Sequence, residues 1–283
     1  MNIYTTAWKT AVKRPGEEKF EILPTNFNFW AADPFPFYHN NKLYIFAELW
    51  FYKENRGAIG YYCVDERMPQ WKVIIKEAHH LSYPHLFVFN NEIYMCPEAN
   101  ESNAIILYRA ASFPDKWEKL APLKTGLRAA DTTFFSYDRD MYCFTYLLDK
   151  QELHLYKVNP NKGFSLEPYC NNPINSDLAT ARMAGNILRY NGQYIRISQN
   201  CSRYYGEALM FSSFEIEKKD YKETLVKRMD VSNFEINSSQ KYIGVHTYNR
   251  INGFEIIDLK YKYICLYDIL FRTLRKIRGC FYG

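Results

Sequence analysis

Carboxylates recur at corresponding places along this chain. Asp33 and Asp131 each stand just before a run of strand-forming residues, and Glu48 and Glu98 each end the second such run of their own stretch. Glycoside chemistry uses two carboxyl groups, one of which protonates the leaving oxygen while the other acts as base or nucleophile. The four carboxylates are therefore candidate functional groups, although an Asp before Pro, such as Asp33, is also a common turn former.

Cationic and aromatic side chains stand at matching places in the other stretches. Tyr83 and His85 lie on either side of a proline at the start of the second stretch, Arg182 precedes the fourth, and His246 lies in the fifth. An arginine at such a place can bind an anionic group on a donor or substrate. Trp50, close to Glu48, offers a flat aromatic face on which a sugar ring can stack.

These positions correspond because one pattern returns five times. Residues 30–50 read as a carboxylate on a turn, a strand, the two-residue turn Asn40-Asn41 and a second strand. Sheet-rich repeats of roughly 40–50 residues are typical of propeller blades, in which each small sheet must stack on its neighbours. The copies begin at Asp33, Pro84, Asp131, Met183 and Val245, and the last is the weakest.

The pattern predicts an all-β fold, a five-bladed β-propeller with four-stranded antiparallel blades. We expect residues 1–265 to form this single domain, with a strand at residues 3–12 that completes the last blade and closes the ring. A β-sandwich with recurrent hairpins is the alternative, but it gives no reason for a polar residue at the same phase of each repeat. In a propeller the innermost strands line a central funnel, so the matching positions would gather at its mouth.

The last residues, 266–283, differ in character from the repeats. Apolar residues near helical spacing are interspersed with basic ones, which predicts a short amphipathic C-terminal helix. Such a helix can make peripheral contact with an anionic membrane surface, and the alternative is a capping helix packed on the propeller. The apolar residues are Ile269, Leu270, Leu274 and Ile277, and the basic ones are Arg272, Arg275, Lys276 and Arg278.

Composition narrows the class of protein. The chain has 283 residues, 18% of them aromatic, and its formal net charge of +5 is a mild excess without a nucleic-acid-binding motif, so we expect no nucleic acid partner. The seven cysteines are odd in number and lack metal-ligand spacing, and neither a signal peptide nor a membrane-spanning run is visible. We expect a cytoplasmic protein, peripheral at the inner membrane face if the C-terminal helix binds lipid, with no cofactor and no metal.

Several phrases resemble those of one family. They are Ala32-Asp33-Pro34, residues 80–84 with Pro97-Glu98 behind them, Ala130-Asp131, residues 181–186, and residues 199–202 with Tyr205-Gly206. The family is the propeller domain found at the N-terminus of glucosamine inositolphosphorylceramide transferase and in bacterial polysaccharide-assembly proteins. It is similar in fold to the five-bladed glycoside hydrolases of families 32, 43 and 130, and the resemblance covers roughly residues 30–250.

The resemblance implies roles for two of the carboxylates. Asp33 matches the first-blade Asp that serves as base or nucleophile in the hydrolases, and Asp131 matches the third-blade Asp that orients the site and tunes pKa. Family 43 hydrolases take a general-acid Glu from the fourth blade, where this chain offers Arg182, Asn186, Gln199 and Asn200 instead. Glu98 or Glu48 could replace that acid, or no acid is needed because a phosphate leaving group departs without strong protonation.

The expected function is therefore a glycosyltransferase that moves a sugar from a nucleotide or polyprenyl-phosphate donor to a surface-polysaccharide or lipid-linked acceptor. Asp33 would deprotonate the acceptor, while Arg182 and His246 would hold donor phosphate. The alternatives are an exo-acting glycoside hydrolase that uses Asp33 and Glu98, and a non-catalytic carbohydrate-binding propeller. The predicted catalytic residues are Asp33, Glu98 and Asp131, and the predicted substrate-binding residues are Glu48, Trp50, Tyr83, His85, Arg182, Asn186 and His246.

Overall fold

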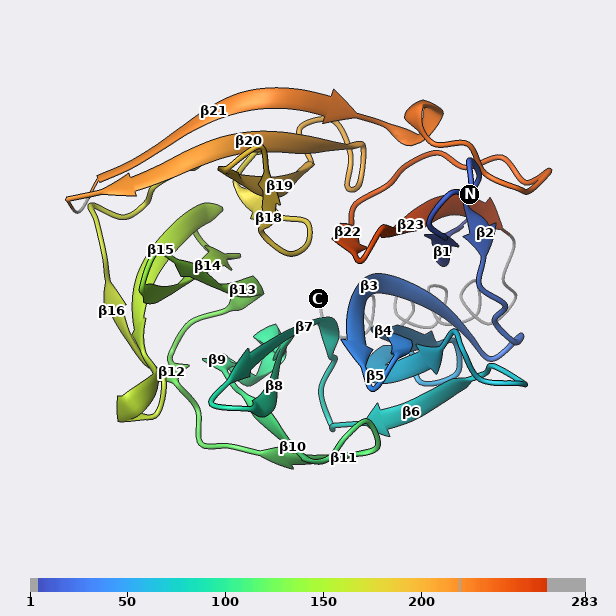
Figure 1. Ribbon diagram of the computed structural model, residues 1–283, viewed down its shortest axis with the longest axis horizontal. Helices are drawn as coiled ribbons and strands as arrows, with labels where there is room; N and C mark the ends of the chain where they lie inside the picture. Colours follow the sequence, from blue (N-terminus) through green and yellow to red (C-terminus); the bar gives the residue numbers. More distant parts are fainter. Residues whose placement is uncertain (1–4, 219, 264–283) are drawn as a thin grey trace, which may run out of the picture.

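Five sheets stand around a common centre in the computed structural model, which describes residues 5–218 and 220–263 (Figure 1). The prediction of an all-β, five-bladed propeller with antiparallel four-stranded blades is confirmed. The C-terminal helix predicted within residues 266–283, and with it the domain boundary at residue 265, lies outside the described residues. No helix in the described part of the chain is long and apolar enough to cross a membrane.

The first two blades each run from the centre outward in chain order. The strands of blade one are β3 (Phe29–His39), β4 (Lys42–Phe51), β5 (Arg56–Cys63) and β6 (Trp71–Ile75). The strands of blade two are β7 (Ser82–Phe89), β8 (Glu92–Glu98), β10 (Tyr108–Ser112) and β11 (Lys116–Lys119), while β9 (Ala104–Ile105) pairs separately with β12 (Lys124–Thr125). Residues 104–110 are thus divided between two sheets.

Blades three and four continue the order. The strands of blade three are β13 (Ala129–Tyr137), β14 (Asp140–Leu147), β15 (Glu152–Asn159) and β16 (Ser165–Pro168). In blade four the innermost strand is interrupted, so that β17 (Arg182–Met183) and β18 (Leu188–Tyr190) both pair with β19 (Gln193–Asn200), which is followed by β20 (Ala208–Glu217) and β21 (Asp220–Met229). Three short 3-10 turns complete the described elements: η1 (Asn100–Ser102), η2 (Pro160–Lys162) and η3 (Val231–Asn233).

The fifth blade joins the two ends of the propeller. Its strands lie in the order β22 (Tyr248–Ile251), β23 (Phe254–Tyr263), β1 (Thr5–Lys13) and β2 (Glu21–Ile22), as Figure 1 shows where blue meets red. The N-terminal strand pairs with β23 over its whole length, from Thr5 opposite Tyr263 to Lys13 opposite Glu255. The predicted closing strand is therefore confirmed.

Tight asparagine turns fix the register of the inner hairpins. Asn40 and Asn41 have φ values of 48° and 59°, and Asn90 and Asn91 have values of 49° and 62°. Two successive residues with positive φ are typical of the two-residue turns whose twist matches that of antiparallel strands, and asparagine tolerates this backbone better than most residues.

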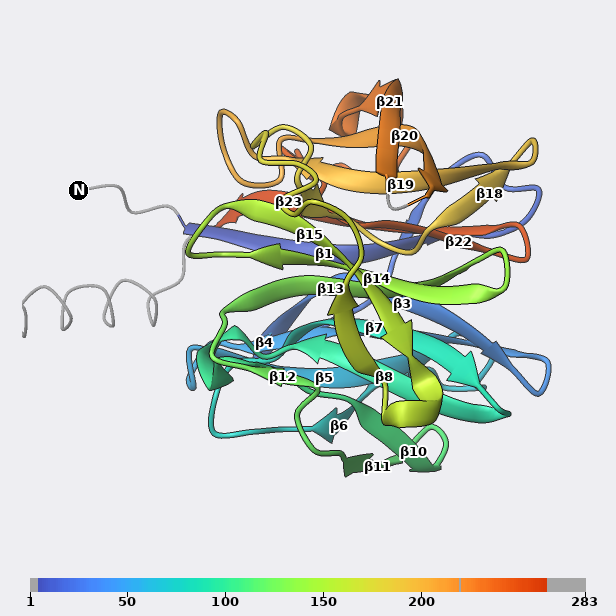
Figure 2. The same ribbon diagram turned by 90° about the vertical axis from the view of Figure 1, so that its left-hand side faces the viewer.

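The core lies between the blades, which stack face against face (Figure 2). One continuous cluster of buried side chains reaches from Phe46 of blade one through Met95 and Phe144 to Phe214 of blade four. Because a single blade buries neither face alone, this packing holds the ring together and fixes how the inner strands stand relative to one another.

Three inner strands carry the same local distortion. The register between the first and second strands shifts after Ala32, Ser82 and Ala130. The residue that follows each shift, Asp33, Tyr83 or Asp131, has a positive φ of 49°, 46° or 51°. Such bulges re-aim side chains and are common beside functional sites. The sequence repeat thus places these three residues at structurally equivalent points of the ring.

Candidate active site

Polar side chains from all five blades gather around the inner strands, away from the asparagine hairpin turns. Asp33 comes from β3, Asp131 from β13 and Arg182 from β17, whereas His246 lies just before β22. Asp33, Asp131 and His246 are almost wholly buried. The gathering predicted from the repeat is present, and it is organised into two ion-paired groups.

His246 is the centre of the first group. Its Nε2 lies 3.1 Å from Asp33 Oδ1 and its Nδ1 lies 2.7 Å from Asp258 Oδ2. The imidazole is buried, which favours the neutral ring, but the two flanking carboxylates outweigh this effect and raise the pKa of His246 to about 10. His246 is therefore a buried imidazolium held between two acids.

Asp258 also fixes the backbone of this group. One of its oxygens accepts the backbone N–H of Asp33 at 3.0 Å, and the other accepts the N–H groups of His246 and Thr247, each at 3.0 Å. Thr247 Oγ1 in turn donates to Asp33 Oδ1 at 2.8 Å. Asp33 Oδ1 thus contacts Thr247 and His246, whereas Asp33 Oδ2 makes no hydrogen bond within the described residues.

Arg182 is the centre of the second group. Its Nε donates to Asp131 Oδ2 at 2.5 Å, and its Nη2 lies 3.5 Å from Glu98 Oε2. Gln199 Nε2 adds a 3.3 Å hydrogen bond to Asp131 Oδ2. Glu98 Oε2 is buried and makes no hydrogen bond within the described residues. A buried carboxylate oxygen without a hydrogen bond is costly, which marks this position as one suited to a ligand.

Glu48 lies on β4 of the first blade and is a further carboxylate of the site. It is buried, and His80 Nε2 lies 3.6 Å from its Oε1. Because Nδ1 of His80 accepts the backbone N–H of Gly57 at 2.9 Å, the neutral ring carries its proton on Nε2, facing Glu48. Burial, followed by the nearby negative charge of Asp33, raises the pKa of Glu48 well above its usual value.

The buried carboxylates titrate in different directions. Burial raises the pKa of Asp33, but His246 and the hydroxyl of Thr247 outweigh it, so that the net shift of Asp33 is downward. Burial raises the pKa of Asp131 to about 8 despite its pairing with Arg182. The ionised form of Asp33 is therefore favoured and the protonated form of Glu48 is favoured, a division typical of an acid and base pair.

Trp50 lies on the rim of the first blade. Its ring stacks on that of Trp30, with centroids 5.5 Å apart and planes 5° from parallel, and it meets His80 edge-on at 5.3 Å. Both tryptophans are half-buried, so that the pair keeps an exposed aromatic edge at the mouth.

Tyr83, His85 and Asn186 form a third group that is directed into the protein. The Tyr83 hydroxyl accepts the backbone N–H of Gly185 at 2.9 Å and lies 2.9 Å from Thr133 Oγ1. His85 Nε2 accepts the backbone N–H of Phe134 at 2.9 Å, and its Nδ1 lies 3.0 Å from Asn186 Oδ1.

Burial lowers the pKa of His85 to about 4, so that this ring is neutral near pH 7. The geometry gives Tyr83 and His85 the role of joining blades, and their prediction as substrate-binding residues finds no support in these contacts.

The sequence reasoning did not name Asp258, and it named Tyr205 only within the family phrases, without a role. Asp258 lies in the middle of β23, where an alternating strand pattern gives no sign of a functional carboxylate. Tyr205 lies on the loop between β19 and β20, and its ring centroid is 5.1 Å from Arg182 Cζ. In the sequence, the length of that loop and its aromatic content were the signals that could have indicated a role for Tyr205.

Three residues of the first group could in principle hold a metal ion. Ligand atoms of Asp33, His246 and Asp258 all lie within 4.8 Å of one another. A metal requires a neutral imidazole, whereas the two carboxylates keep this ring protonated on both nitrogens near neutral pH. Metal binding by these three residues would therefore have to release the imidazole proton.

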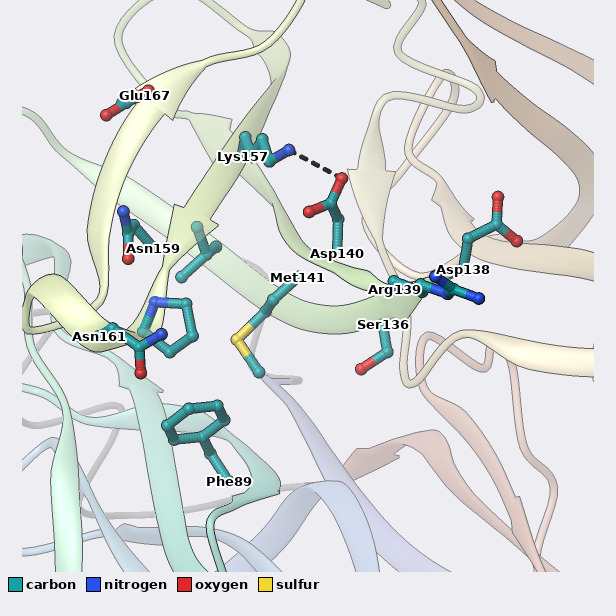
Figure 3. A pocket seen from close by; sticks show the side chains of 12 residues that line it. Phe89, Ser136, Asp138, Arg139, Asp140, Met141, Lys157, Asn159, Asn161 and Glu167 are labelled. Atoms are coloured by element: carbon teal, nitrogen blue, oxygen red, sulfur yellow. Dashed lines mark hydrogen bonds and ion pairs between the residues drawn. The ribbon is translucent and has the colours of Figure 1, made fainter.

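Two cavities open at the other end of the inner strands. The first has a volume of about 450 Å³ and lies between blades two and three; Figure 3 shows its apolar side chains Phe89 and Met141 and the 2.7 Å ion pair of Lys157 with Asp140. The second, of about 490 Å³, is lined by His85 and Asn186 among others. Neither contains the carboxylates of the candidate site.

The fold and the site together define a class of protein, a five-bladed propeller with an acid-rich centre. The catalytic domain of a GH62 α-L-arabinofuranosidase from Coprinopsis cinerea superposes with a TM-score of 0.61 at 9% identity, covering 89% of this chain and 97% of that one. A GH62 hydrolase in complex with xylotriose gives a TM-score of 0.60 at 12% identity, over 90% of this chain and 97% of that structure. At such identities the likeness shows the fold alone.

Sequence comparison identifies the family to which the chain belongs. The family model described as "Glucosamine inositolphosphorylceramide transferase 1, N-terminal" matches residues 17–268, and the chain belongs to this family. A protein of Arabidopsis thaliana named glucosamine inositolphosphorylceramide transferase 1 is 30% identical over 242 residues, which are 81% of this chain. Its namesake from japonica rice is 31% identical over 214 residues, 72% of this chain. The chain spans only 30% and 28% of the lengths of these relatives.

Proposed function

We propose that this propeller transfers a glycosyl group from a phosphate-activated donor to a hydroxyl of a surface-polysaccharide or lipid-linked acceptor. The observation that carries the proposal is Arg182, a cation at the fourth-blade rim where the hydrolases of similar fold, by the resemblance drawn above, carry a general acid. The names of the plant relatives, which are transferases, support the same class of reaction. Those relatives are about three times as long as the matched region, so that their activity is not assigned to this domain by similarity alone.

In this proposal Asp33 is the base. Its pKa is lowered, so it is ionised at neutral pH, and its Oδ2 is free of protein partners within the described residues. The acceptor hydroxyl gives its proton to Asp33 as its oxygen attacks the anomeric carbon. His246, paired with Asp33 and Asp258, keeps the carboxylate in place and supplies positive charge beside it.

Arg182 is the group that neutralises the leaving phosphate. A charge-assisted hydrogen bond from a guanidinium to phosphate is strong and directional. Asp131 and Glu98 hold the arginine from one side, leaving its side chain partly open, at 20% exposure. The two carboxylates also offer acceptors for sugar hydroxyls, and the Trp30–Trp50 pair offers a stacking surface at the rim.

The test is a transfer assay with a panel of nucleotide sugars and polyprenyl-phosphate sugars, in which glycan and lipid-linked acceptors are followed by mass spectrometry. We expect one donor to support transfer, and Asp33→Asn to lower its rate by about 100-fold or more, as is usual for loss of a general base. Asp140→Asn is the matched control, because Asp140 is an exposed aspartate paired with Lys157. Absence of transfer from every donor, together with cleavage of free glycosides, contradicts the proposal.

A specific observation favours glycoside hydrolysis as the second candidate. The pKa of Glu48 is raised and that of neighbouring Asp33 is lowered, and this is the direction of the two shifts that an acid and base pair for glycoside cleavage requires. In that reaction Glu48, or Glu98 of the second ion-paired group, would protonate the leaving oxygen. Hydrolysis of an oligosaccharide, whose sugar leaving group needs protonation, that is lost in both Asp33→Asn and Glu48→Gln would favour this candidate over transfer.

A further inference from the structure

The loop of blade four that follows β19 carries a tyrosine held firmly over the site. The carbonyl of Tyr205 accepts a 2.6 Å hydrogen bond from Lys260 Nζ, and the carbonyl of Gly206 accepts the backbone N–H of Val245 at 3.0 Å. Gly206 has a φ of 72°, and a Cβ at this position would lie 2.5 Å from Trp8 Cη2. The loop is therefore pinned to blade five, and its conformation requires glycine.

The Tyr205 ring bridges the two ion-paired groups of the site. It lies 5.1 Å from Arg182 Cζ on one side, and it meets the ring of His246 edge-on at a centroid distance of 5.1 Å on the other. Trp8, which packs on His246 at 3.8 Å, meets Tyr205 edge-on at 6.0 Å. Tyr205 thus touches the cation that pairs with Asp131 and the imidazolium that pairs with Asp33.

The hydroxyl of Tyr205 is available to a ligand. No described residue hydrogen-bonds to it, and the residue keeps 38% of its surface exposed. Loss of hydration raises the pKa of this phenol well above its usual value, and Asp33, Asp131 and Glu98 add to the effect. At physiological pH the group is therefore a neutral hydrogen-bond donor that keeps its proton.

We propose that the Tyr205 hydroxyl donates a hydrogen bond to a phosphate oxygen of the leaving group, at the place in the fourth blade where a carboxylic acid is missing. The inference rests on the proposed function. The acceptor oxygen bonds to the anomeric carbon, its proton passes to Asp33, and the bond from that carbon to the phosphate oxygen breaks. The phosphate leaves with the bonding electron pair, which Arg182 neutralises while Tyr205 shares its proton.

The neighbouring tyrosine provides a matched control. Tyr204 is 47% exposed and its hydroxyl donates to the carbonyl of Ile243 at 3.5 Å, away from Arg182 and His246. Tyr204→Phe and Tyr205→Phe each remove one hydroxyl from the same loop, so that a general effect on the loop appears in both variants and a specific contact appears in one.

The experiment measures the binding of inorganic pyrophosphate and of UDP at pH 7 by titration calorimetry, for the wild type and both variants. We expect Tyr205→Phe to weaken binding by about tenfold, as for the loss of one hydrogen bond to a charged group, and Tyr204→Phe to leave it unchanged. Once a donor is identified, Tyr205→Phe should lower kcat most for donors with the most basic leaving group, which a purely structural role of the ring would not produce.

Equal binding by the wild type and Tyr205→Phe overturns the assignment of Tyr205 and leaves the transferase proposal standing. Equal losses in both variants also overturn it, because they point to the loop as a whole. If the wild type binds neither pyrophosphate nor UDP, and free sugars alone raise its melting temperature, then the transferase proposal fails and the phosphate contact of Tyr205 fails with it.

Discussion

At the scale of single residues, the site is defined by neighbouring carboxylates whose pKa values shift in opposite directions. The pKa of Asp33 is lowered because His246 and Thr247 stabilise its charge, whereas the pKa of Glu48 is raised because it is buried beside another acid. Five acids, Asp33, Glu48, Glu98, Asp131 and Asp258, share two strong cations, Arg182 and His246. Retained protons thus relieve part of the repulsion that full ionisation would create.

The raised pKa of Glu48 makes a prediction for stability. The folded state keeps a proton that the unfolded chain releases near pH 4.5, so that stability falls as the pH rises above that value toward the folded pKa. Glu48→Gln removes this dependence while preserving shape. We expect a higher melting temperature at pH 7, by about 2–4 °C per kcal/mol recovered, and no difference near pH 4. Thermal unfolding followed by circular dichroism checks this.

Glu215→Gln is the control for Glu48→Gln, because Glu215 lies exposed on β20. It should leave the melting temperature nearly unchanged at both pH values. A Glu48→Gln variant that is less stable than the wild type at pH 7 would show that the ionised carboxylate is stabilised in the fold, against the direction of its pKa shift.

His246 also predicts stability that falls with rising pH, but in a higher pH range, and here removal of the side chain is expected to destabilise the fold. Its pKa rises from 6.5 to about 10 on folding, so its stabilising contribution is complete below pH 6.5 and is lost as the pH rises through about 10. His246→Gln leaves Asp33 and Asp258 buried without a cation, and we expect it to cost about 3–5 kcal/mol at pH 6. Urea unfolding at pH 6 and pH 10 measures this cost, which should shrink at the higher pH.

His39→Gln serves as the control for His246→Gln. His39 packs against Phe113 at a centroid distance of 4.8 Å and makes no ion pair within the described residues. A cost for His246→Gln that is independent of pH would mean that the ring acts by packing on Trp8 and not through its charge.

At the scale of elements, a bulge in three of the inner strands sets the direction of the side chains at the candidate site. Asp33, Tyr83 and Asp131 occupy the same left-handed position in blades one to three. The side chains of Asp33 and Asp131 enter the two ion-paired groups, whereas that of Tyr83 reaches Gly185 of blade four. The same backbone feature therefore directs a side chain to the candidate site in two blades and to a contact between blades in one.

Tyr83→Phe tests that cohesive role. The change leaves the backbone N–H of Gly185 without its hydroxyl acceptor and removes the contact with Thr133, so that we expect a loss of about 1–3 kcal/mol in the free energy of unfolding. Tyr190→Phe, on the exposed surface at 63% exposure, should cost nearly nothing. Equal chemical-denaturation midpoints for Tyr83→Phe and the wild type would contradict the cross-blade role.

The repeat made much of this element-level structure predictable. A turn, a strand, an asparagine turn and a strand recur in phase, and the phase placed Asp33, Asp131, Arg182 and His246 together. Other features depend on contacts that no local pattern records. The break between β17 and β18 occurs at Gly185, where a Cβ would lie 3.0 Å from Asn249 Oδ1 of blade five. Asp258 likewise owes its place in the site to tertiary contacts, namely those with Asp33 of blade one and with His246.

At the scale of the whole molecule, the site depends on closure of the ring. His246 and Asp258 come from blade five and Asp33 from blade one, so that the first ion-paired group spans the junction between them. The junction blade is completed only by β1, whose pairing with β23 joins the two ends of the described chain. Trp8 of this same strand packs on His246, so that closure and site geometry are coupled.

That coupling can be tested with two substitutions in β1. Ala11 is fully buried opposite Ile257, whereas Thr6 is exposed on the same strand. Ala11→Asp buries an unpaired charge in the junction blade, and we expect it to cost several kcal/mol and to lower the melting temperature of the entire domain in one transition. Thr6→Asp should be nearly neutral. The contrary outcome is that Ala11→Asp adds only a small separate unfolding transition and the variant still binds pyrophosphate. The ring would then be stable without its closing strand, and the site would not depend on closure.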